Sequence, residues 1–403
     1  MRYSVAVMTS FGLTADQQEY ADRVRDLART HFSGRDLRQS HEPGEQGHVD
    51  RRLLRRLGDL GLLRGLFGGE PEEAPHDAAA MQLCLLRETL AGVDTAAETA
   101  LALQGLGSYP ILQSGARETA ERWLPGVITG EVVAGFALSE PGAGSDAAAL
   151  ALRAQPDGDG WRLFGEKTWI SNAPEADVYT VFARTTSDAG ARGVTAFAVS
   201  GDAEGLGGEH LDLLTPHAIG RLTFEGVRVE RADVLGEVDA GFRVAMRTLD
   251  LFRPSVGAFA VGMAQAALES AVRWSIEREV HGGPLHEQQA VSHALAEMAT
   301  QVQASRLLVR AAASAYDSGA PAADVTKAAA MAKLYATESA QRVVDQAVQL
   351  HGARALQRGH LLEHLYREVR APRIYEGASE VQRTIIGRAL VREARTTHTD
   401  ERP

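Results

Sequence analysis

Near its C-terminal end the chain reads Arg373-Ile374-Tyr375-Glu376-Gly377-Ala378-Ser379. This stretch sets one carboxylate between an aromatic residue and a glycine, just ahead of a helical run. A second stretch, residues 136–146, reads Phe-Ala-Leu-Ser-Glu-Pro-Gly-Ala-Gly-Ser-Asp. It is a turn-dense loop, since proline and glycine favour turns, and its backbone N–H groups suit a planar, oxygen-rich ligand. A third stretch, residues 165–173, reads Gly-Glu-Lys-Thr-Trp-Ile-Ser-Asn-Ala and continues as a strand.

Composition limits the classes of protein that the chain can belong to. Its 403 residues are too many for one compact core and predict two or three domains. The formal net charge of −11 argues against a nucleic-acid partner, because phosphate binding needs a clustered basic surface. The chain has a single cysteine, Cys84, which excludes an internal disulfide and favours a reducing, cytoplasmic location. Cys84 itself is expected to be a buried small apolar residue. No stretch approaches the ~20 apolar residues that span a bilayer, and no targeting segment is expected.

The period of the apolar residues divides the chain into three parts. Residues 12–132 predict an N-terminal helical domain, which opens with a capping box at Thr14 and Gln17 and includes one helical stretch from Met81 to Leu103. Residues 133–242 alternate as strands do and predict a middle antiparallel β-domain, with a hairpin turn at residues 157–160. Residues 243–395 predict an alanine-rich C-terminal bundle of four-helix type. The predicted fold class is therefore α+β and multidomain.

The three quoted stretches, in their order along the chain, resemble the acyl-CoA dehydrogenase family, and the resemblance covers most of residues 12–395. It implies the fold of that family, FAD as cofactor, and α,β-dehydrogenation of an acyl thioester to the 2-enoyl thioester. In that reaction a carboxylate removes the Cα proton while hydride passes from Cβ to flavin N5. The resemblance also implies a homotetramer or dimer and an electron-transferring flavoprotein as electron acceptor.

The resemblance assigns the catalytic base to Glu376. Some relatives place their catalytic Glu in the segment 249–255, at the position of Phe252, and phenylalanine cannot take a proton. Burial beside Tyr375 is expected to raise the basicity of the carboxylate. The backbone N–H of Glu376 and a ribityl hydroxyl of FAD would hold the thioester carbonyl as an oxyanion hole. The expected substrate contacts are Ser145, Asp250, Arg253, Tyr375 and Gly377, although Arg253 could equally be a solvated helix charge.

Fourteen residues are expected to bind the cofactor. Leu138 and Ser139 would bond the polar edge of the flavin, Trp169 would pack against the ring, and Ser171 would approach N5. Segments around residues 278–289 and 349–355 resemble those that grip the ADP half of FAD across a subunit boundary. The full expected set is Phe136, Leu138, Ser139, Trp169, Ile170, Ser171, Arg278, His281, Gln289, Gln349, Gly352, Ala353, Ala378 and Glu380.

Four departures from the family pattern fall on this expected ADP grip. The family usually carries Phe at the position of His281, glycines at Ala353 and Ala355, and a hydroxyl residue at Ala378. Glycine lets backbone approach a ligand closely, and a hydroxyl can donate a hydrogen bond. The departures therefore predict weakened or rearranged binding of the FAD adenylate.

Alternative functions are weighed beside this one. A flavin oxidase or oxygenase of the same fold would pass electrons to dioxygen, and a degenerate relative would bind thioesters without redox activity. The run His360-Leu361-Leu362-Glu363-His364 matches the H-x-x-E-H pattern of a zinc peptidase, but a solvated helix or loop face is the favoured interpretation, and no metal site is expected. Residues 160–168 approach a phosphate loop, but the strand that continues after Lys167 excludes the helix N-terminus that such a loop needs.

Overall fold

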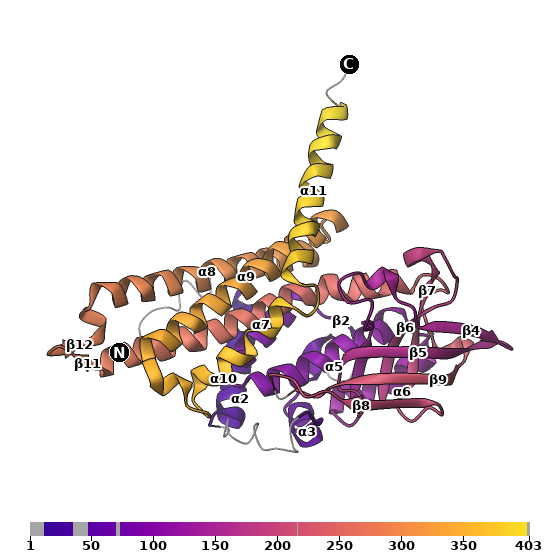
Figure 1. Cartoon of the computed structure of the whole chain (residues 1–403), viewed down its shortest axis with the longest axis horizontal. Coiled ribbons are helices and arrows are strands. Elements are labelled where there is room, and N and C mark those ends of the chain that lie inside the picture. Colours follow the sequence, from indigo (N-terminus) through magenta and orange to yellow (C-terminus); the bar gives the residue numbers. More distant parts are fainter. Residues whose placement is uncertain (1–11, 35–46, 70–72, 216, 401–403) are drawn as a thin grey trace. The chain divides into compact units, whose positions relative to one another are not determined.

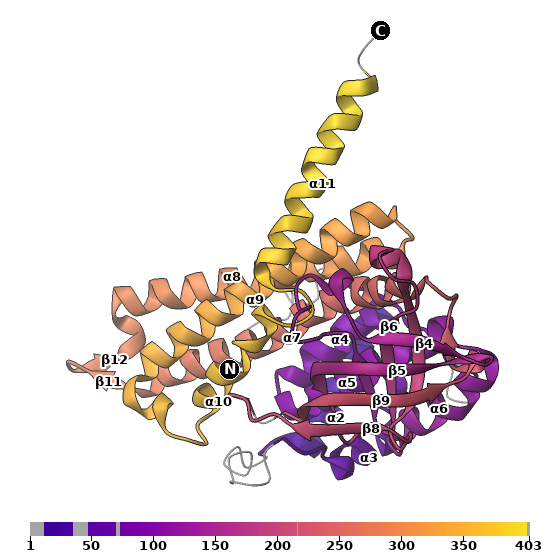
Figure 2. The ribbon, with the colours of Figure 1, turned by 45° about the vertical axis from the view of Figure 1, so that its right-hand side comes forward.

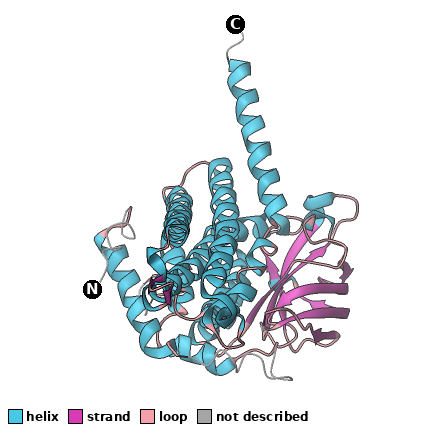
Figure 3. Ribbon diagram, turned by 60° about the vertical axis from the view of Figure 1, so that its left-hand side comes forward, coloured by secondary structure: helices cyan, strands magenta, loops and turns pink. Residues whose placement is uncertain are grey.

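The computed structural model describes residues 12–34, 47–69, 73–215 and 217–400. Contacts divide the chain into two compact units. We call the first the helical unit (Met1–Arg38, Ala79–Thr95 and Asp250–Pro403) and the second the sheet unit (Gln39–Ala78 and Ala96–Leu249). Helices fill the first unit and strands dominate the second (Figure 3).

The helical unit is built around long helices, of which α8 and α9 lie side by side (Figure 1). Thr14 caps α2 with the reciprocal capping box that the sequence predicts. The helices are α2 (Ala15–Phe32), α4 (Ala80–Ala91), α7 (Gly241–Glu277, from Asp250 on), α8 (Gln289–Asp317), α9 (Ala322–His351), α10 (Leu361–Glu368) and α11 (Ser379–Asp400). Short elements complete the unit: β11 (Glu279–Val280), β12 (Gly283–Pro284), η6 (Leu285–Glu287), η7 (Gly352–Leu356) and η8 (Ala371–Arg373).

Small residues let the central helix α7 approach its neighbours closely. A Cβ on Gly262 would lie 2.3 Å from the carbonyl oxygen of Glu88 on α4, and one on Gly257 would lie 2.8 Å from Val309 on α8. Only glycine permits such distances. α7 is long and apolar enough to cross a membrane, but 78% of its most apolar window is buried inside the protein, as in the core helix of a globular protein.

The helical stretch predicted from Met81 to Leu103 is wrong as one element. The structure has two helices there, α4 and α5 (Thr95–Ser114). Gly92 is the C-cap of α4, and its N–H bonds to the carbonyl of Glu88. Asp94 then bonds back to Leu90, so the chain turns before α5 begins.

An eight-stranded sheet organises the described part of the sheet unit, in the order β10-β7-β6-β4-β5-β9-β8 with β3 beside β6 (Figure 2). The pairing is mostly antiparallel, as predicted, but β6 pairs in parallel with both β3 and β4. The strands are β3 (Ala134–Ala137), β4 (Arg153–Asp157), β5 (Gly160–Ser171), β6 (Val178–Arg184), β7 (Val194–Ser200), β8 (Leu206–His210), β9 (Ile219–Val229) and β10 (Val234–Leu235). The predicted hairpin is confirmed, because Asp157 pairs with Gly160.

Helices and short turns complete the sheet unit. They are α3 (Arg51–Asp59), α5, α6 (Arg117–Thr129), β1 (Phe67–Gly68), β2 (His76–Asp77), η2 (Arg64–Leu66), η3 (Ala147–Ala149), η4 (Gly190–Gly193) and η5 (Arg231–Asp233). The core of this unit joins side chains from most of the strands, among them Leu163, Ile170, Val181, Phe197 and Val227, all at most 1% exposed. Such a packed sheet gives the loops at its edges a fixed base.

Candidate active site

The backbone between η8 and α11 takes an unusual path at Glu376. Glu376 has φ +50° and Gly377 has φ +95°, so two successive residues are left-handed. A left-handed backbone is uncommon for any residue other than glycine, and it occurs mostly where surrounding structure enforces it. A Cβ on Gly377 would come within 2.3 Å of Gln382 Nε2 and displace this buried amide, and any other residue would be strained at this positive φ.

Two buried side chains hold this turn through one carbonyl group. Lys333 Nζ on α9 donates to the Gly377 oxygen at 2.6 Å, and Gln382 Nε2 on α11 donates to the same oxygen at 2.9 Å. Both side chains belong to fully buried residues. The carbonyl therefore has both of its lone pairs satisfied, and the plane of the following peptide is fixed.

Glu338 on α9 accepts hydrogen bonds from residues at both ends of the same loop. Its Oε1 accepts hydrogen bonds from Arg373 Nε at 3.0 Å and from Ser379 Oγ at 2.7 Å. Burial alone would raise the pKa of Glu338, but the hydrogen bonds from Ser379 and Arg373 hold it below its ordinary value. An ionised Glu338 thus anchors both ends of the stretch that carries Glu376.

The Glu376 carboxyl group lies in a buried and positively charged environment. Burial raises the pKa of Glu376 above the ordinary glutamate value, while Arg87, Lys333 and Arg253 act in the opposite direction. Its Oε2 atom is buried and makes no hydrogen bond within the described residues. A carboxylate with an unbonded oxygen and a raised pKa is equipped to accept a proton.

Arg253 on α7 is buried, so the interpretation of this residue as a solvated helix charge is wrong. It is 5% exposed and its Nη1 bonds to Asp250 Oδ1 at 3.1 Å. Thr326 on α9 donates to the other oxygen of Asp250 at 3.0 Å. Burial lowers the pKa of Arg253, although the negative charges of Asp250 and Glu376 oppose the shift. Asp250 thereby holds the positive charge of Arg253 in one place in the surroundings of Glu376.

In the sheet unit, a buried ion pair fixes the turn-dense loop after β3. Lys167 on β5 is fully buried and bonds to Glu140 Oε1 at 2.7 Å and to the Leu138 carbonyl at 2.9 Å. Glu140 also accepts the backbone N–H groups of Ala151 and Leu152, which close the loop at its far end. Burial lowers the pKa of Lys167 to about 8, against the attraction of Glu140. Lys167 lies inside a strand, so the rejection of a phosphate loop is confirmed.

Trp169 presents its indole at the surface of the same strand. Its φ is +60° and it is 58% exposed, although the neighbouring Ile170 is 1% exposed. The register of β5 against β9 shifts between Lys167 and Ile170, so the strand bulges at the tryptophan. A bulge redirects a side chain, and here it turns a large aromatic ring away from the core. Such an exposed indole is a suitable platform for a planar ring system.

The other expected site residues differ in how far they are buried and in the unit to which they belong. In the sheet unit, Phe136 packs against Phe182 with ring centroids 5.0 Å apart, Ser139 and Ser171 are half-buried, and Ser145 is exposed. In the helical unit, Tyr375 is 37% exposed, Ala378 is half-buried, and Glu380 is exposed and pairs with Arg383. The expected ADP residues are exposed at helix ends and in the β11–β12 hairpin: Arg278, His281, Gln289, Gln349, Gly352 and Ala353.

Two of the departures from the family pattern have a local explanation. His281 has φ +50° and precedes Gly282 at φ +88°, so the two residues form the tight turn of the β11–β12 hairpin. Histidine is one of the non-glycine residues enriched in this region, so it suits the turn better than phenylalanine does. Ala355 is completely buried, so its methyl group packs inside the protein.

The H-x-x-E-H run does not assemble a metal site. His360 caps α10 by accepting the N–H of Leu362, Glu363 pairs with Arg367 at 2.8 Å, and His364 is buried with Nε2 2.6 Å from Thr95 Oγ1.

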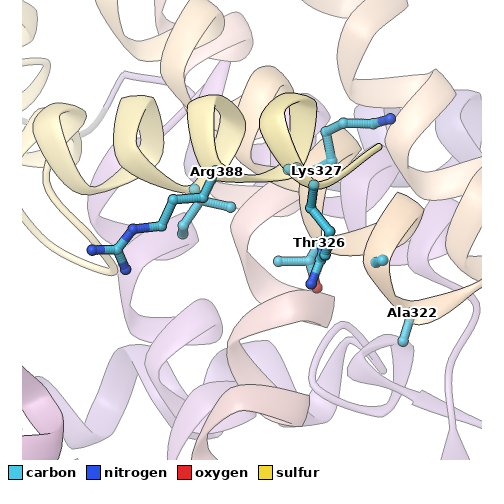
Figure 4. A pocket seen from close by; sticks show the side chains of 8 residues that line it. Ala322, Thr326, Lys327 and Arg388 are labelled. Atoms are coloured by element: carbon cyan, nitrogen blue, oxygen red, sulfur yellow. The ribbon is translucent and has the colours of Figure 1, made fainter. Parts of the chain in front are cut away.

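A surface pocket lies between α9 and α11 (Figure 4), and none of the residues that line it is an expected site residue. The residues that line it are Ala322, Ala323, Thr326, Lys327, Ile385, Arg388, Ala389 and Arg392.

Three residues around Glu376 were not found from the sequence: Arg87, Lys333 and Gln382. Arg87 on α4 is 3% exposed and donates to Ser255 Oγ at 2.7 Å. Burial lowers the pKa of Lys333 to about 8, against the attraction of Glu376. A lone lysine within the alanine-rich face of α9 was the available signal, because a charge at such a position needs a buried partner.

Three family profiles match, and together they span most of the chain: acyl-CoA dehydrogenase, N-terminal domain (residues 14–131), middle domain (135–229) and C-terminal domain (239–391). The chain is 35% identical over 351 residues to cyclohexane-1-carbonyl-CoA dehydrogenase of Geobacter metallireducens, covering 86% of this chain and 91% of that protein. It is 35% identical over 376 residues to the caffeyl-CoA reductase-Etf complex subunit CarC of Acetobacterium woodii, covering 92% and 98%.

Among solved structures, butyryl-CoA dehydrogenase from Megasphaera elsdenii superimposes with a TM-score of 0.86 at 33% identity, covering 94% of this chain and 99% of that one. The fold and the matched domains define a flavoprotein oxidoreductase. The chain belongs to the acyl-CoA dehydrogenase family. In the sheet unit the residues present fit a flavin, because the bulged Trp169 offers an uncovered aromatic ring.

Proposed function

We propose that this protein removes hydrogen from Cα and Cβ of an acyl-CoA or acyl-carrier-protein thioester, with Glu376 as the base and FAD as the cofactor. The family membership supports acyl-CoA chemistry in general, and the relatives act on different acyl groups by their names. The single observation that carries the proposal is the Glu376 carboxyl group, whose Oε2 atom is buried and unbonded and whose pKa is raised.

The chain's own residues supply the proton transfer and its setting. The Cα–H of a thioester is a weak acid, and its proton moves to Glu376 as the C–H bond breaks. Burial makes the carboxylate a stronger base, while the positive charges of Arg87, Lys333 and Arg253 favour its ionised form. The backbone N–H of Glu376 would donate to the thioester carbonyl and stabilise the negative charge that develops there.

When bound, FAD supplies the acceptor for the hydride that leaves Cβ. In the sheet unit, Trp169, Ser171, Leu138 and Ser139 would hold the flavin end. In the helical unit, Arg278, Gln289 and the segment 349–353 would hold the ADP end. The Glu140–Lys167 ion pair would keep the loop at Leu138 and Ser139 in one conformation. Those positions follow the family pattern, and the exposure of Trp169 supports the flavin end.

The remaining proposals concern partners and location. An electron-transferring flavoprotein as acceptor is supported by the relative whose name includes an Etf complex. A homotetramer or dimer is supported by exposed apolar side chains on α11, where Leu390 and Val391 are 51% and 54% exposed, since contiguous apolar surface often marks an interface. A cytoplasmic location is supported by the reduced, buried Cys84.

The experiment begins with the visible spectrum of the purified protein. It continues with anaerobic titration by thioesters of varied chain length and branching. The wild type is expected to carry flavin absorption and to bleach with a matching thioester. Glu376→Gln should keep flavin and thioester binding and lose at least about 10³-fold in bleaching rate, the upper part of the range for a general base. Glu297→Gln, an exposed position on α8, is the matched control.

Two outcomes would redirect the proposal. Rapid reoxidation of the bleached protein by air, with no need for a flavoprotein acceptor, would indicate the oxidase alternative. A colourless protein that takes up no FAD would indicate a thioester-binding scaffold. Retained bleaching by Glu376→Gln would contradict the assignment of the base.

A further inference from the structure

Three metal-ligating side chains from distant parts of the sequence meet in the sheet unit. His48 lies just before α3, Glu175 lies in the turn between β5 and β6, and His210 ends β8. His48 and Glu175 are 127 residues apart in the chain. α3 and β8 lie at the same edge of the unit (Figure 2). None of the three is among the residues expected to bind flavin or thioester.

The spacing of the three ligand atoms suits one metal ion. All three lie within 4.8 Å of one another. His210 Nε2 is 3.1 Å from Glu175 Oε1, and His48 Nδ1 contacts the same oxygen. In a tetrahedral zinc site with bonds of about 2.0–2.2 Å, neighbouring donor atoms are about 3.3–3.5 Å apart. Small rotations of the side chains would place all three around one ion.

The hydrogen bonds of His210 indicate that a positive charge belongs between it and Glu175. Its Nδ1 lies 3.0 Å from the carbonyl oxygen of Gly47, and a carbonyl can only accept, so Nδ1 carries the hydrogen. In a neutral imidazole Nε2 then has a lone pair, and this atom faces a carboxylate oxygen. Two electron-rich atoms at that distance repel each other. Either a second proton or a metal cation must lie between them.

The surroundings orient the ligands as those of metal sites usually do. A ligating histidine commonly donates its other ring N–H to a backbone carbonyl, as His210 does to Gly47. Val49 N donates to Glu175 Oε2 at 2.9 Å, which turns Oε1 toward the imidazoles. Arg51 bonds to the Glu175 carbonyl at 2.8 Å and to both oxygens of Asp177, so the turn that carries Glu175 is anchored independently.

We propose that His48, Glu175 and His210 bind one divalent transition-metal ion, with Zn²⁺ as the preferred occupant. Two imidazoles and one carboxylate suit zinc, and softer or harder cations would prefer thiolate or all-oxygen ligands. Three protein ligands leave a fourth position for water, and the side chain of His48 is 53% exposed, so the ion can enter from solvent. The ion ties the segment at residues 47–51 to β8 and to the β5–β6 turn. This departs from the sequence analysis, which expected no metal site.

Zinc binding to the untagged, full-length flavoprotein tests the proposal. After chelator treatment and its removal, isothermal titration with ZnCl₂ is expected to give one site per chain. His210→Ala and Glu175→Gln should weaken that site by at least about 100-fold, more than loss of an outer-shell partner costs. His293→Ala, an exposed histidine on α8, is the matched control and should bind as the wild type does.

Two further measurements keep the test decisive if a variant is unstable. Zinc should raise the thermal unfolding temperature of the wild type and of His293→Ala but not that of His210→Ala, with all three compared first in chelator. X-ray absorption of the zinc-loaded protein should show imidazole and oxygen ligands at about 2.0–2.2 Å. Equal zinc affinity in wild type and His210→Ala, or no stoichiometric uptake, would overturn the proposal and identify the cluster as a proton-bridged ion pair.

Discussion

Replacing Lys333 by methionine is expected to move the acid limb of the pH–rate profile to higher pH. Lys333 donates to the carbonyl of the residue that follows Glu376, and its positive charge favours the ionised form of that acid. Methionine keeps an unbranched side chain of similar length and removes the charge. Gln382 still donates to the same carbonyl, so the loop is expected to keep its path.

The size of the shift follows from the charge that is lost. Two unit charges about 6 Å apart, at an effective dielectric constant of about 20, interact by about 3 kcal/mol, which equals about 2 pKa units. Arg87 and Arg253 remain near Glu376 and limit the effect. We therefore expect the acid limb to move to higher pH by less than that amount.

The sign is fixed by the role of the base. Turnover needs ionised Glu376, so the rate rises with pH through its pKa, and a raised pKa delays the rise. Anaerobic flavin bleaching by a saturating thioester, followed from acid to alkaline pH, measures the limb directly. The rates of the variant and the wild type should differ most in acid and approach each other in alkali. Lys327→Met, on the same helix and paired with Glu393, is the matched control.

Coincident acid limbs would refute the reasoning. If Lys333→Met and wild type agree within about 0.3 pH unit, or about 0.4 kcal/mol, Lys333 does not act on Glu376 through its charge. A uniform loss of rate at every pH would assign Lys333 to loop positioning alone. A shift in Lys327→Met as large as in Lys333→Met would show a general effect of net charge.

Three further perturbations test the surroundings of the site. In urea unfolding, Gly377→Ala should destabilise the protein by more than about 2 kcal/mol, because it combines left-handed strain with a 2.3 Å contact. The control, Gly387→Ala on open helix surface, should stabilise the protein by about 0.4–1 kcal/mol. Glu140→Gln should cost about 3–5 kcal/mol, since it leaves Lys167 buried without its partner charge, and an unchanged urea midpoint would contradict this. Trp169→Ala should raise the flavin dissociation constant by about 2–13-fold, equal to about 0.5–1.5 kcal/mol of ring stacking, and unaltered affinity would remove the indole from the flavin site.

Local signals in the sequence predicted much of the fold. The capping box at Thr14, the hairpin at Asp157–Gly160 and the strand through Lys167 each depend on neighbours within a few residues, and the structure confirms them. The break between α4 and α5 was missed, because the apolar period continues across Gly92 and only the turn at Asp94 reveals the end of a helix.

The candidate site was only partly accessible from the sequence. Glu376 could be named from its motif, but its partners Lys333 and Arg87 come from other helices, and no local pattern reports contacts of such long range. The left-handed backbone of Trp169 arises from a register shift against β9, which a single strand cannot reveal. For the same reason the meeting of His48 with Glu175 was invisible before the strands were paired.

The Gly377 carbonyl, which accepts two hydrogen bonds, has a consequence for how the sequence of this enzyme can diverge during evolution. This turn requires glycine, and it is fixed by one hydrogen-bond donor from each of two helices. Substitutions within it would therefore disturb the position of Glu376. Side chains outside this loop can change without moving the acid. The position of the acid is therefore retained while other parts of the sequence change.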